Sequence, residues 1–213
     1  MDFVRAISFP FDDDEWPVKF IIGTLLSLIP FFGQGYQVRV ARNMIRGERN
    51  PLPSTDELGQ VFIDGLMAFI AWFIYFLPMI LVACVLIFPA LLAGDSDTRT
   101  LLLCTCGACV VLLALLYSIP AFALYSTGVI RYAETGNFSS FMQFEALWQD
   151  MTANFGLLFT TWLYAMALGL LGALVSPIAA VTVVGIPLLV FYYQVASGHL
   201  IGQAGIMMTR GGQ

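Results

Sequence analysis

The sequence predicts an all-α, polytopic integral membrane bundle, and three observations support this fold class. Of the 213 residues, 59% are hydrophobic and only 11% are charged, whereas soluble domains carry about 25% charged residues. Every Asp, Glu, Lys and Arg lies outside four uncharged stretches, at residues 20–38, 65–94, 100–130 and 151–209. A bilayer core of about 30 Å requires roughly 20 apolar residues in a helix. The first three stretches are therefore each long enough for one span, and the fourth is long enough for two.

We expect one membrane domain over residues 1–213, with five spans. The first span is the least regular, because its Gly and Pro residues allow it either to bend or to enter the membrane and return. A tight hairpin without charges, at Ser176-Pro177, is expected to separate the last two spans. The five predicted spans cover about 18–38, 66–93, 101–127, 155–175 and 179–206.

Two further segments, at about 54–64 and 140–151, read as amphipathic helices. Each begins with a hydroxyl residue that is followed three positions later by an acid or amide, Ser54 with Glu57 and Ser140 with Gln143. This spacing is typical of a capping box at a helix start. Apolar residues gather on one face of each segment, so the two helices either lie at the lipid–water boundary or cap the bundle itself.

Residues that recur 89 positions apart indicate a tandem repeat. In each unit a span ends near an Ile-Pro pair, and a Tyr, an Arg and a Gly then precede an amphipathic segment. The alternative to a duplication is that these matches arose by chance, because so few residue types dominate the composition. A true duplication would be a parallel repeat, unlike the inverted repeats of many transporters. The paired positions are Tyr36 and Tyr125, Val40 and Val129, Arg42 and Arg131, Gly47 and Gly136, and Leu58 and Leu147.

The basic residues predict the orientation, because cytoplasmic loops carry an excess of Lys and Arg. Four arginines crowd residues 39–49, whereas 94–100 holds Arg99 beside two acids. We therefore expect 39–49, the loop 128–154 and the C-terminus in the cytoplasm. Five spans place the N-terminus outside, and a returning first segment would place it inside. The net charge of −5 argues against a nucleic-acid partner.

The first third of the chain also carries distinctive short motifs, over about residues 9–79. Together they resemble an uncharacterised prokaryotic membrane protein family, domain of unknown function 4013. The resemblance implies a bacterial or archaeal integral membrane protein, in the cytoplasmic (inner) membrane, and it implies no activity. The motifs are Phe9-Pro10-Phe11-Asp12, Ile29-Pro30, Gly35-Tyr36, Arg46-Gly47, Pro51-Leu52-Pro53, Phe62-Ile63-Asp64-Gly65 and Tyr75-Phe76-Leu77-Pro78.

Arginines form the most informative polar set. On a helix that continues from the first span, their spacing of three, four and three places them on one face. One hypothesis is that they bind anionic lipid headgroups or an acidic segment of a partner. The other is that they serve only as the signal that orients the chain in the membrane. Arg131 occupies the matching position of the second repeat unit. The candidate binding residues are Arg39, Arg42, Arg46, Arg49 and Arg131.

A lone histidine, His199, and several small residues complete the candidates. His199 either packs within the bundle or binds a flat cofactor such as haem. Small residues four positions apart suit close helix packing, and we expect this of Gly169 with Ala173 and of Gly198 with Gly202. The three cysteines of Cys104-x-Cys106-x-x-Cys109 do not share one helix face, so we expect no metal there, and we expect no resident cofactor.

The spans lack ionisable residues, paired carboxylates and a hydrolytic triad, so we expect no enzyme activity. The favoured function is a structural or accessory subunit that packs against other membrane components in the bilayer. The alternative is a passive or weakly coupled permease for a small or lipid-like substrate. Its mark would be a polar cavity between spans, for which the candidate lining residues are Thr160, Thr161, Tyr164 and Gln194. The third hypothesis is a membrane subunit that binds a cofactor through His199.

Overall fold

A computed structural model describes residues 1–182 and 184–211, and within these residues the chain is entirely helical, which confirms the all-α prediction. Three 3-10 turns join the helices at Phe9–Asp12 (η1), Thr55–Glu57 (η2) and Phe138–Phe141 (η3). The eight α-helices of the described residues are α1 (Phe3–Ser8), α2 (Trp16–Leu26), α3 (Phe32–Ile45), α4 (Leu58–Leu92), α5 (Ser96–Thr135), α6 (Phe144–Ala153), α7 (Phe155–Ala179) and α8 (Gly185–Gly211).

Three helical segments are long and apolar enough to cross a membrane: Thr55–Leu92, which joins η2 to α4, together with α5 and α7. They indicate a multi-pass membrane protein, as the sequence predicts. Prolines at 78, 89 and 120 lie inside α4 and α5 without ending them. Neighbouring helices and local adjustment allow such prolines within membrane helices.

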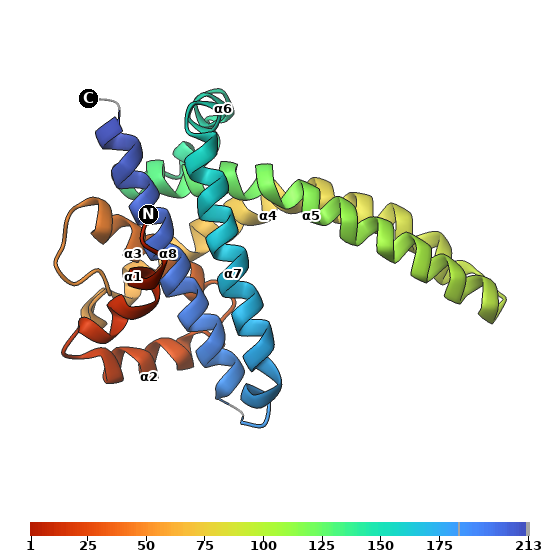
Figure 1. Cartoon of the computed structure of the whole chain (residues 1–213), viewed down its shortest axis with the longest axis horizontal. Helices are drawn as coiled ribbons and strands as arrows, with labels where there is room; N and C mark the ends of the chain where they lie inside the picture. Colours follow the sequence, from red (N-terminus) through yellow and green to blue (C-terminus); the bar gives the residue numbers. More distant parts are fainter. Residues whose placement is uncertain (183, 212–213) are drawn as a thin grey trace.

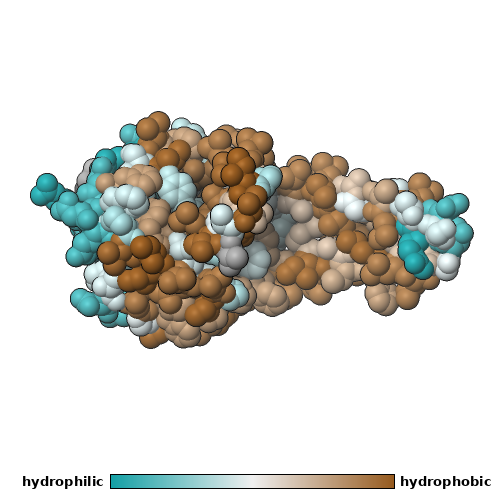
Figure 2. Space-filling view, turned by 90° about the horizontal axis from the view of Figure 1, so that it is seen from below, coloured by the Kyte–Doolittle hydropathy of each residue, from teal (hydrophilic) through white to brown (hydrophobic). Residues whose placement is uncertain are grey.

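Two helical hairpins diverge from a common base (Figure 1). The first, which we call the arm, is the antiparallel pair α4 and α5, and it projects far beyond the rest of the molecule. The second is the pair α7 and α8. The base consists of α3, α6 and the ends of the long helices, and α3 packs mainly against α8 and α4. The arm is hydrophobic along its length, with hydrophilic residues at its tip and at the opposite end of the molecule (Figure 2).

The buried core lies in the base. One cluster joins α3, α4, α5 and α8 through side chains such as Val38, Tyr75, Val129 and Ile201. A second cluster packs the N-terminal segments against α3 and α8. Most apolar side chains beyond the base are exposed, for example Val85 and Leu101 on the arm. Only the base is therefore packed like the core of a soluble protein, and the rest of the molecule exposes apolar side chains.

The structure divides the first predicted span, 18–38, between two helices. α2 ends at Leu26, and α3 begins only at Phe32. Pro30 lies in the break, where it lacks an N–H donor and disfavours a helical conformation of the preceding residue. The chain then turns back, so Phe9, before the break, and Leu52, after it, pack in one cluster.

The two predicted amphipathic helices also differ from the structure. Residues 54–64 are not a separate helix, because η2 leads directly into α4, and Ser54 makes no side-chain cap. The second begins at Phe144 rather than at Ser140, whose hydroxyl lies 2.8 Å from that of Thr135. Neither predicted capping box forms. The long apolar sequence after Asp64 continues the helix and outweighs the local cap signal.

The predicted hairpin at Ser176-Pro177 lies slightly too early. α7 includes Pro177 and continues to Ala179, and the chain turns before α8 begins at Gly185. The predicted spans 101–127 and 155–175 fall within α5 and α7, and 66–93 falls within α4 except for Ala93, which is the C-cap of α4. Each helix is longer than its prediction. Residues 179–206 include the turn, and α8 is not among the three segments that meet the criteria for a span.

Candidate functional site

The base is built on a close approach of α3 to α4. A Cβ added to Gly35 would lie 1.9 Å from the carbonyl oxygen of Val61, and one added to Gly65 would lie 2.1 Å from that of Phe31. Only glycine permits this separation of the two backbones. The contact places the following turn of α3 directly beside Asp64 of α4.

Asp64 is the centre of a buried charge cluster. Its Oδ2 lies 2.7 Å from Arg39 Nε and 2.8 Å from Arg42 Nη1. Its Oδ1 accepts a hydrogen bond from the hydroxyl of Tyr132, at 2.7 Å. Arg42 also donates to the carbonyl of Ala133, and its guanidinium carbon lies 5.4 Å from the centre of the Tyr132 ring. The cluster therefore ties α3, α4 and α5 together.

This cluster changes the role of the predicted arginine face. Arg39 and Arg42 are only 7% and 6% exposed, and they point into the base rather than toward headgroups. Arg39 also donates to the side-chain oxygen of Gln60. Arg46 ends α3 as its C-cap, and Arg49 lies beyond the helix; both are exposed. Two of the four arginines are thus placed for surface contacts, and two hold the fold.

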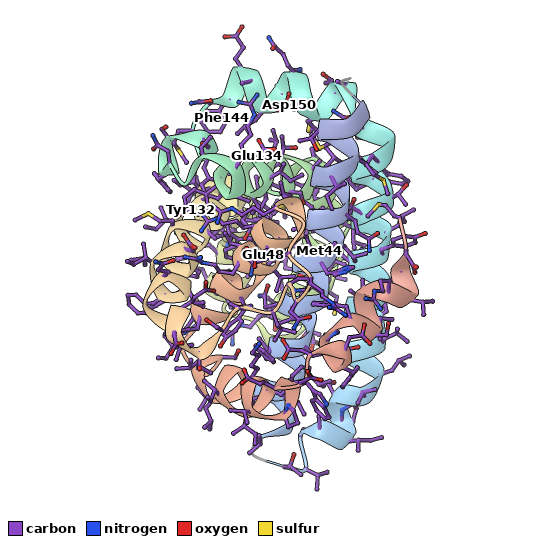
Figure 3. All side chains as sticks on the ribbon, turned by 90° about the vertical axis from the view of Figure 1, so that its left-hand side faces the viewer. Met44, Glu48, Tyr132, Glu134, Phe144 and Asp150 are labelled. Atoms are coloured by element: carbon purple, nitrogen blue, oxygen red, sulfur yellow. The ribbon has the colours of Figure 1, made fainter. Side chains whose placement is uncertain are left out.

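Arg131 occupies a similar position in the second half of the chain. Its Nε lies 2.6 Å from Asp150 Oδ2 on α6, and both side chains are about one third exposed. Figure 3 shows the end of α5, with Tyr132 and Glu134, lying beside α6, which carries Asp150.

The geometry repeats in both halves. Val40 and Val129 are each fully buried, and α3 and α5 are each followed by a glycine with positive φ, Gly47 at 74° and Gly136 at 69°. In both halves, an arginine that precedes this glycine pairs with an aspartate on a later helix. These similarities are local, and the tandem repeat stays a prediction.

A buried polar link connects α3, α5 and α8. The side chain of Gln37 donates from Nε2 to Ser197 Oγ at 2.8 Å, and its Oε1 accepts from the Tyr125 hydroxyl at 2.9 Å. Beside it, Cβ atoms added to Gly198 and Gly202 would lie 2.5 Å from the Gln37 carbonyl oxygen and 2.6 Å from Met44 Cβ. These two glycines therefore lie at the tight contact between α8 and α3.

His199 faces the N-terminal segment. Its ring stacks on Phe9 with centroids 4.3 Å apart, and its Nδ1 lies 3.0 Å from Gln203 Nε2. Gln203 in turn holds the backbone of Asp2 through two hydrogen bonds. A pocket of about 350 Å³ lies beside His199, and the charged side chains that line it include Arg5, Asp12 and Arg49. His199 thus helps to attach the N-terminus to α8.

The small residues of α7 are placed differently from those of α8. A Cβ on Gly169 would meet only the ring of Tyr193, at 3.9 Å, and one on Gly172 would have no atom within 4 Å. Gly169, Gly172 and Ala173 instead line an apolar hollow of about 640 Å³ along α7 and α8, which we call the α7/α8 groove. Gly169 and Ala173 therefore line this hollow instead of forming the predicted close helix contact.

A second hollow lies where the two hairpins separate, and we call it the interhairpin cleft. Its volume is about 230 Å³. The cleft and the α7/α8 groove share Tyr193 and Gln194 in their linings. Among the described residues, none that lines the cleft is charged. Its polar side chains are Gln34, Gln37, Ser118, Tyr125, Tyr193 and Gln194, and its aromatic walls are Trp72, Phe76, Phe122 and Trp162.

Sequence reasoning missed Gln34 and Gln37 as parts of this cleft. Both lie in the first predicted span, and no spacing rule relates them to Gln194. Thr160 and Thr161 lie on α7, and their hydroxyls donate to carbonyls of their own helix. The available signal was the occurrence of four glutamines, Gln34, Gln37, Gln194 and Gln203, within long uncharged stretches.

The described residues contain no group of three or more His, Cys, Asp or Glu that could hold a metal ion. Cys104 and Cys109 are exposed on the arm, and Cys106 is half-buried. At the arm tip, Asp95 caps α5, and hydrogen bonds from the N–H and hydroxyl of Thr98 lower the pKa of its carboxyl group.

Comparison with known families finds one match, and it covers most of the chain. The matching family is described as a protein of unknown function (DUF4013), and the match extends over residues 22–185. Comparison with curated proteins and with solved structures finds no match. The resemblance that the short motifs indicated is thus confirmed, and the chain belongs to the DUF4013 family of proteins of unknown function.

Proposed function

We propose that this protein is a non-catalytic integral membrane protein that serves as an accessory subunit by packing against other membrane components. The arm carries this proposal. α4 and α5 pack on one another along the arm, yet large apolar side chains such as Val85 (72% exposed), Leu92 (69%) and Leu101 (68%) remain uncovered. Exposed apolar surface on this scale is typical of a lipid or protein contact surface.

The membrane topology that we propose has four crossings, by α4, α5, α7 and α8, and one segment that enters and returns, residues 18–38. α4 has 35 residues and is therefore about 52 Å long at 1.5 Å per residue. A bilayer core is about 30 Å thick, so the arm must tilt strongly or extend beyond it. The divergence of the two hairpins in Figure 1 is compatible with opposite tilts.

Charge supports a cytoplasmic base in a prokaryotic inner membrane. The N-terminal segment lies beside Glu48 and Arg49, so with this topology eight of the nine Lys and Arg residues belong to the base side, and only Arg99 lies at the tip. This distribution is the one expected when the base is cytoplasmic. Both ends of the chain are then cytoplasmic, and α6, with Phe144 and Trp148 exposed, lies at the interface.

The exposed arginines suit the anionic surface of that leaflet. Arg46 and Arg49 are exposed near the end of α3, where each can attract anionic headgroups by about 1 kcal/mol. Arg39 and Arg42 contribute structurally, through Asp64, and do not face the lipid.

The test is purification from the native membrane in a mild detergent, followed by mass spectrometry. We expect a stoichiometric membrane partner. Gly107 on the arm has open space around it, as does Gly59 at the base. A bulky Gly107→Trp side chain should therefore reduce co-purification, whereas Gly59→Trp should not. A partner-free, monodisperse wild-type protein would contradict the accessory role.

A second candidate is supported by the interhairpin cleft. A passive or weakly coupled permease for a small or lipid-like substrate needs polar groups at membrane depth between its helices. The cleft provides glutamine, serine and tyrosine side chains between the hairpins. Uptake of the candidate substrate into proteoliposomes would test transport separately from partner binding.

A further inference from the structure

The interhairpin cleft contains a polar group without a partner. Gln34 lines the cleft, and its Oε1 is buried with no hydrogen-bond partner among the described residues. A buried, unpaired amide oxygen is costly. Rotation of the amide exchanges its oxygen and nitrogen, so the group can offer an acceptor or a donor to a bound molecule. A hydroxyl group, which both donates and accepts, satisfies it in either orientation.

The lining also restricts the charge of the occupant. None of the cleft residues is Asp, Glu, Lys or Arg. A phosphate or an ammonium group would enter without a counter-charge, at a high cost in a medium of low dielectric constant. The occupant is therefore uncharged. The aromatic walls, Trp72 and Trp162 among them, suit the apolar part of a molecule next to its polar end.

The hollow beside the cleft has room for more than a small polar group. The α7/α8 groove has a volume of about 640 Å³ and an apolar lining, and it shares Tyr193 and Gln194 with the cleft. Gly172 leaves open space in its wall. An occupant with one small polar end and one long apolar chain matches both hollows, and the bilayer is the source of such molecules.

We propose that the two hollows together bind an uncharged bilayer lipid with a free hydroxyl group, of the diacylglycerol type. Its hydroxyl lies against the Gln34 amide in the cleft, and an acyl chain lies in the α7/α8 groove. This binding goes beyond the accessory role and depends neither on a partner nor on transport. If the protein is a permease, this lipid class is its expected ligand. The proposed lipid binding remains valid even if the protein is neither an accessory subunit nor a permease.

Tryptophan fluorescence provides the test, because bromine atoms quench a nearby indole on contact. Trp72 and Trp162 line the cleft, whereas Trp16 and Trp148 are exposed elsewhere and are replaced by Phe. The full chain is reconstituted into phosphatidylcholine nanodiscs and titrated with brominated diacylglycerol. We expect saturable quenching that exceeds the quenching by brominated phosphatidylcholine or phosphatidylglycerol at equal mole fraction.

Matched variants assign the binding to the two hollows. Gln34→Leu removes the amide and should weaken diacylglycerol binding about fivefold, the value of one hydrogen bond. Gly172→Leu places a larger side chain in the groove at a position where an added Cβ meets no atom within 4 Å, and it should weaken binding as well. Gln149→Leu, on the exposed face of α6, is the control and should bind as the unmodified chain does.

Two results would overturn the proposal. One is quenching by brominated diacylglycerol that does not exceed quenching by the charged and zwitterionic lipids. The other is equal affinity in Gln34→Leu and Gln149→Leu, provided that both elute as monodisperse proteins. If Gln34→Leu does not fold, unchanged affinity in Gly172→Leu overturns it instead. Partner capture from the native membrane reports on the accessory role independently.

Discussion

Gly35 and Val61 lie so close that an added Cβ at Gly35 would stand 1.9 Å from the Val61 carbonyl oxygen. Real Cβ atoms do not approach a carbonyl at this distance, and a helix carbonyl cannot move without loss of its own hydrogen bond. We expect Gly35→Ala to separate α3 from α4 and to lower the unfolding free energy by several kcal/mol, on the order of other overpacked contacts.

The control for this change is Gly59→Ala, since Gly59 has no atom within 4 Å of its added Cβ. It should leave thermal unfolding in detergent unchanged or slightly raised, because alanine favours a helix. Equal melting temperatures for the two variants would contradict the close contact.

Asp64→Asn should be among the most damaging single changes. It leaves Arg39 and Arg42 buried without a negative charge, and removal of one partner of a buried ion pair costs about 3–5 kcal/mol. Asp150→Asn is the matched control, because the Arg131–Asp150 pair is about one third exposed and such pairs contribute about 1 kcal/mol or less. Denaturant unfolding in detergent measures both.

A double variant refines this test. Arg39→Gln should partly restore stability in the Asp64→Asn background, since it removes one of the two uncompensated charges. If the second substitution instead adds its full cost to the first, the two side chains do not interact through charge.

Cysteine labelling tests the topology. In a chain whose four cysteines are replaced by alanine, we expect Ser96→Cys at the arm tip to react with a membrane-impermeant maleimide in intact cells. Glu48→Cys at the base should react only after the cells are opened. Asp14→Cys should behave as Glu48→Cys does, because the N-terminal segment lies beside residues 48–52. Labelling of Asp14→Cys from outside would show that residues 18–38 cross the membrane.

His199 gives a simple spectroscopic prediction. Phe9 covers one face of its ring and Gln203 occupies Nδ1, so we expect its role to be packing, and the purified protein to be colourless. A Soret band that is present in the wild type and lost in His199→Ala would contradict this and would assign a haem ligand.

The long helices were predictable from the sequence, and the polar contacts were not. Uncharged stretches of 30 residues specify a membrane helix almost regardless of context, so α4, α5 and α7 follow from composition. The break at Pro30 was visible, but its outcome was not, because Gly and Pro permit both a bend and a return. The direction of that turn depends on contacts such as those of Phe9 with Leu52 and its neighbours.

The candidate site was predictable only in part for a related reason. The arginine spacing correctly placed Arg39 and Arg42 on one helix face, yet that face is buried by Asp64, 22 residues after Arg42. The Gly35–Gly65 contact that brings the helices together is a tertiary feature without a local signal. Gln34 and Gln194 come together for a similar reason, since they lie on helices that meet only in the folded base.

The concentration of charge at the base has a consequence for biogenesis. In the proposed topology, insertion of the arm transfers only Asp95, Asp97 and Arg99 across the lipid, and the turn between α7 and α8 transfers no charge. Each hairpin can therefore enter the bilayer as a preformed pair of helices with its backbone groups satisfied. Arg39 and Arg42 of α3, which pair with Asp64, remain on the side of synthesis, where the base can complete its folding after both hairpins are in place.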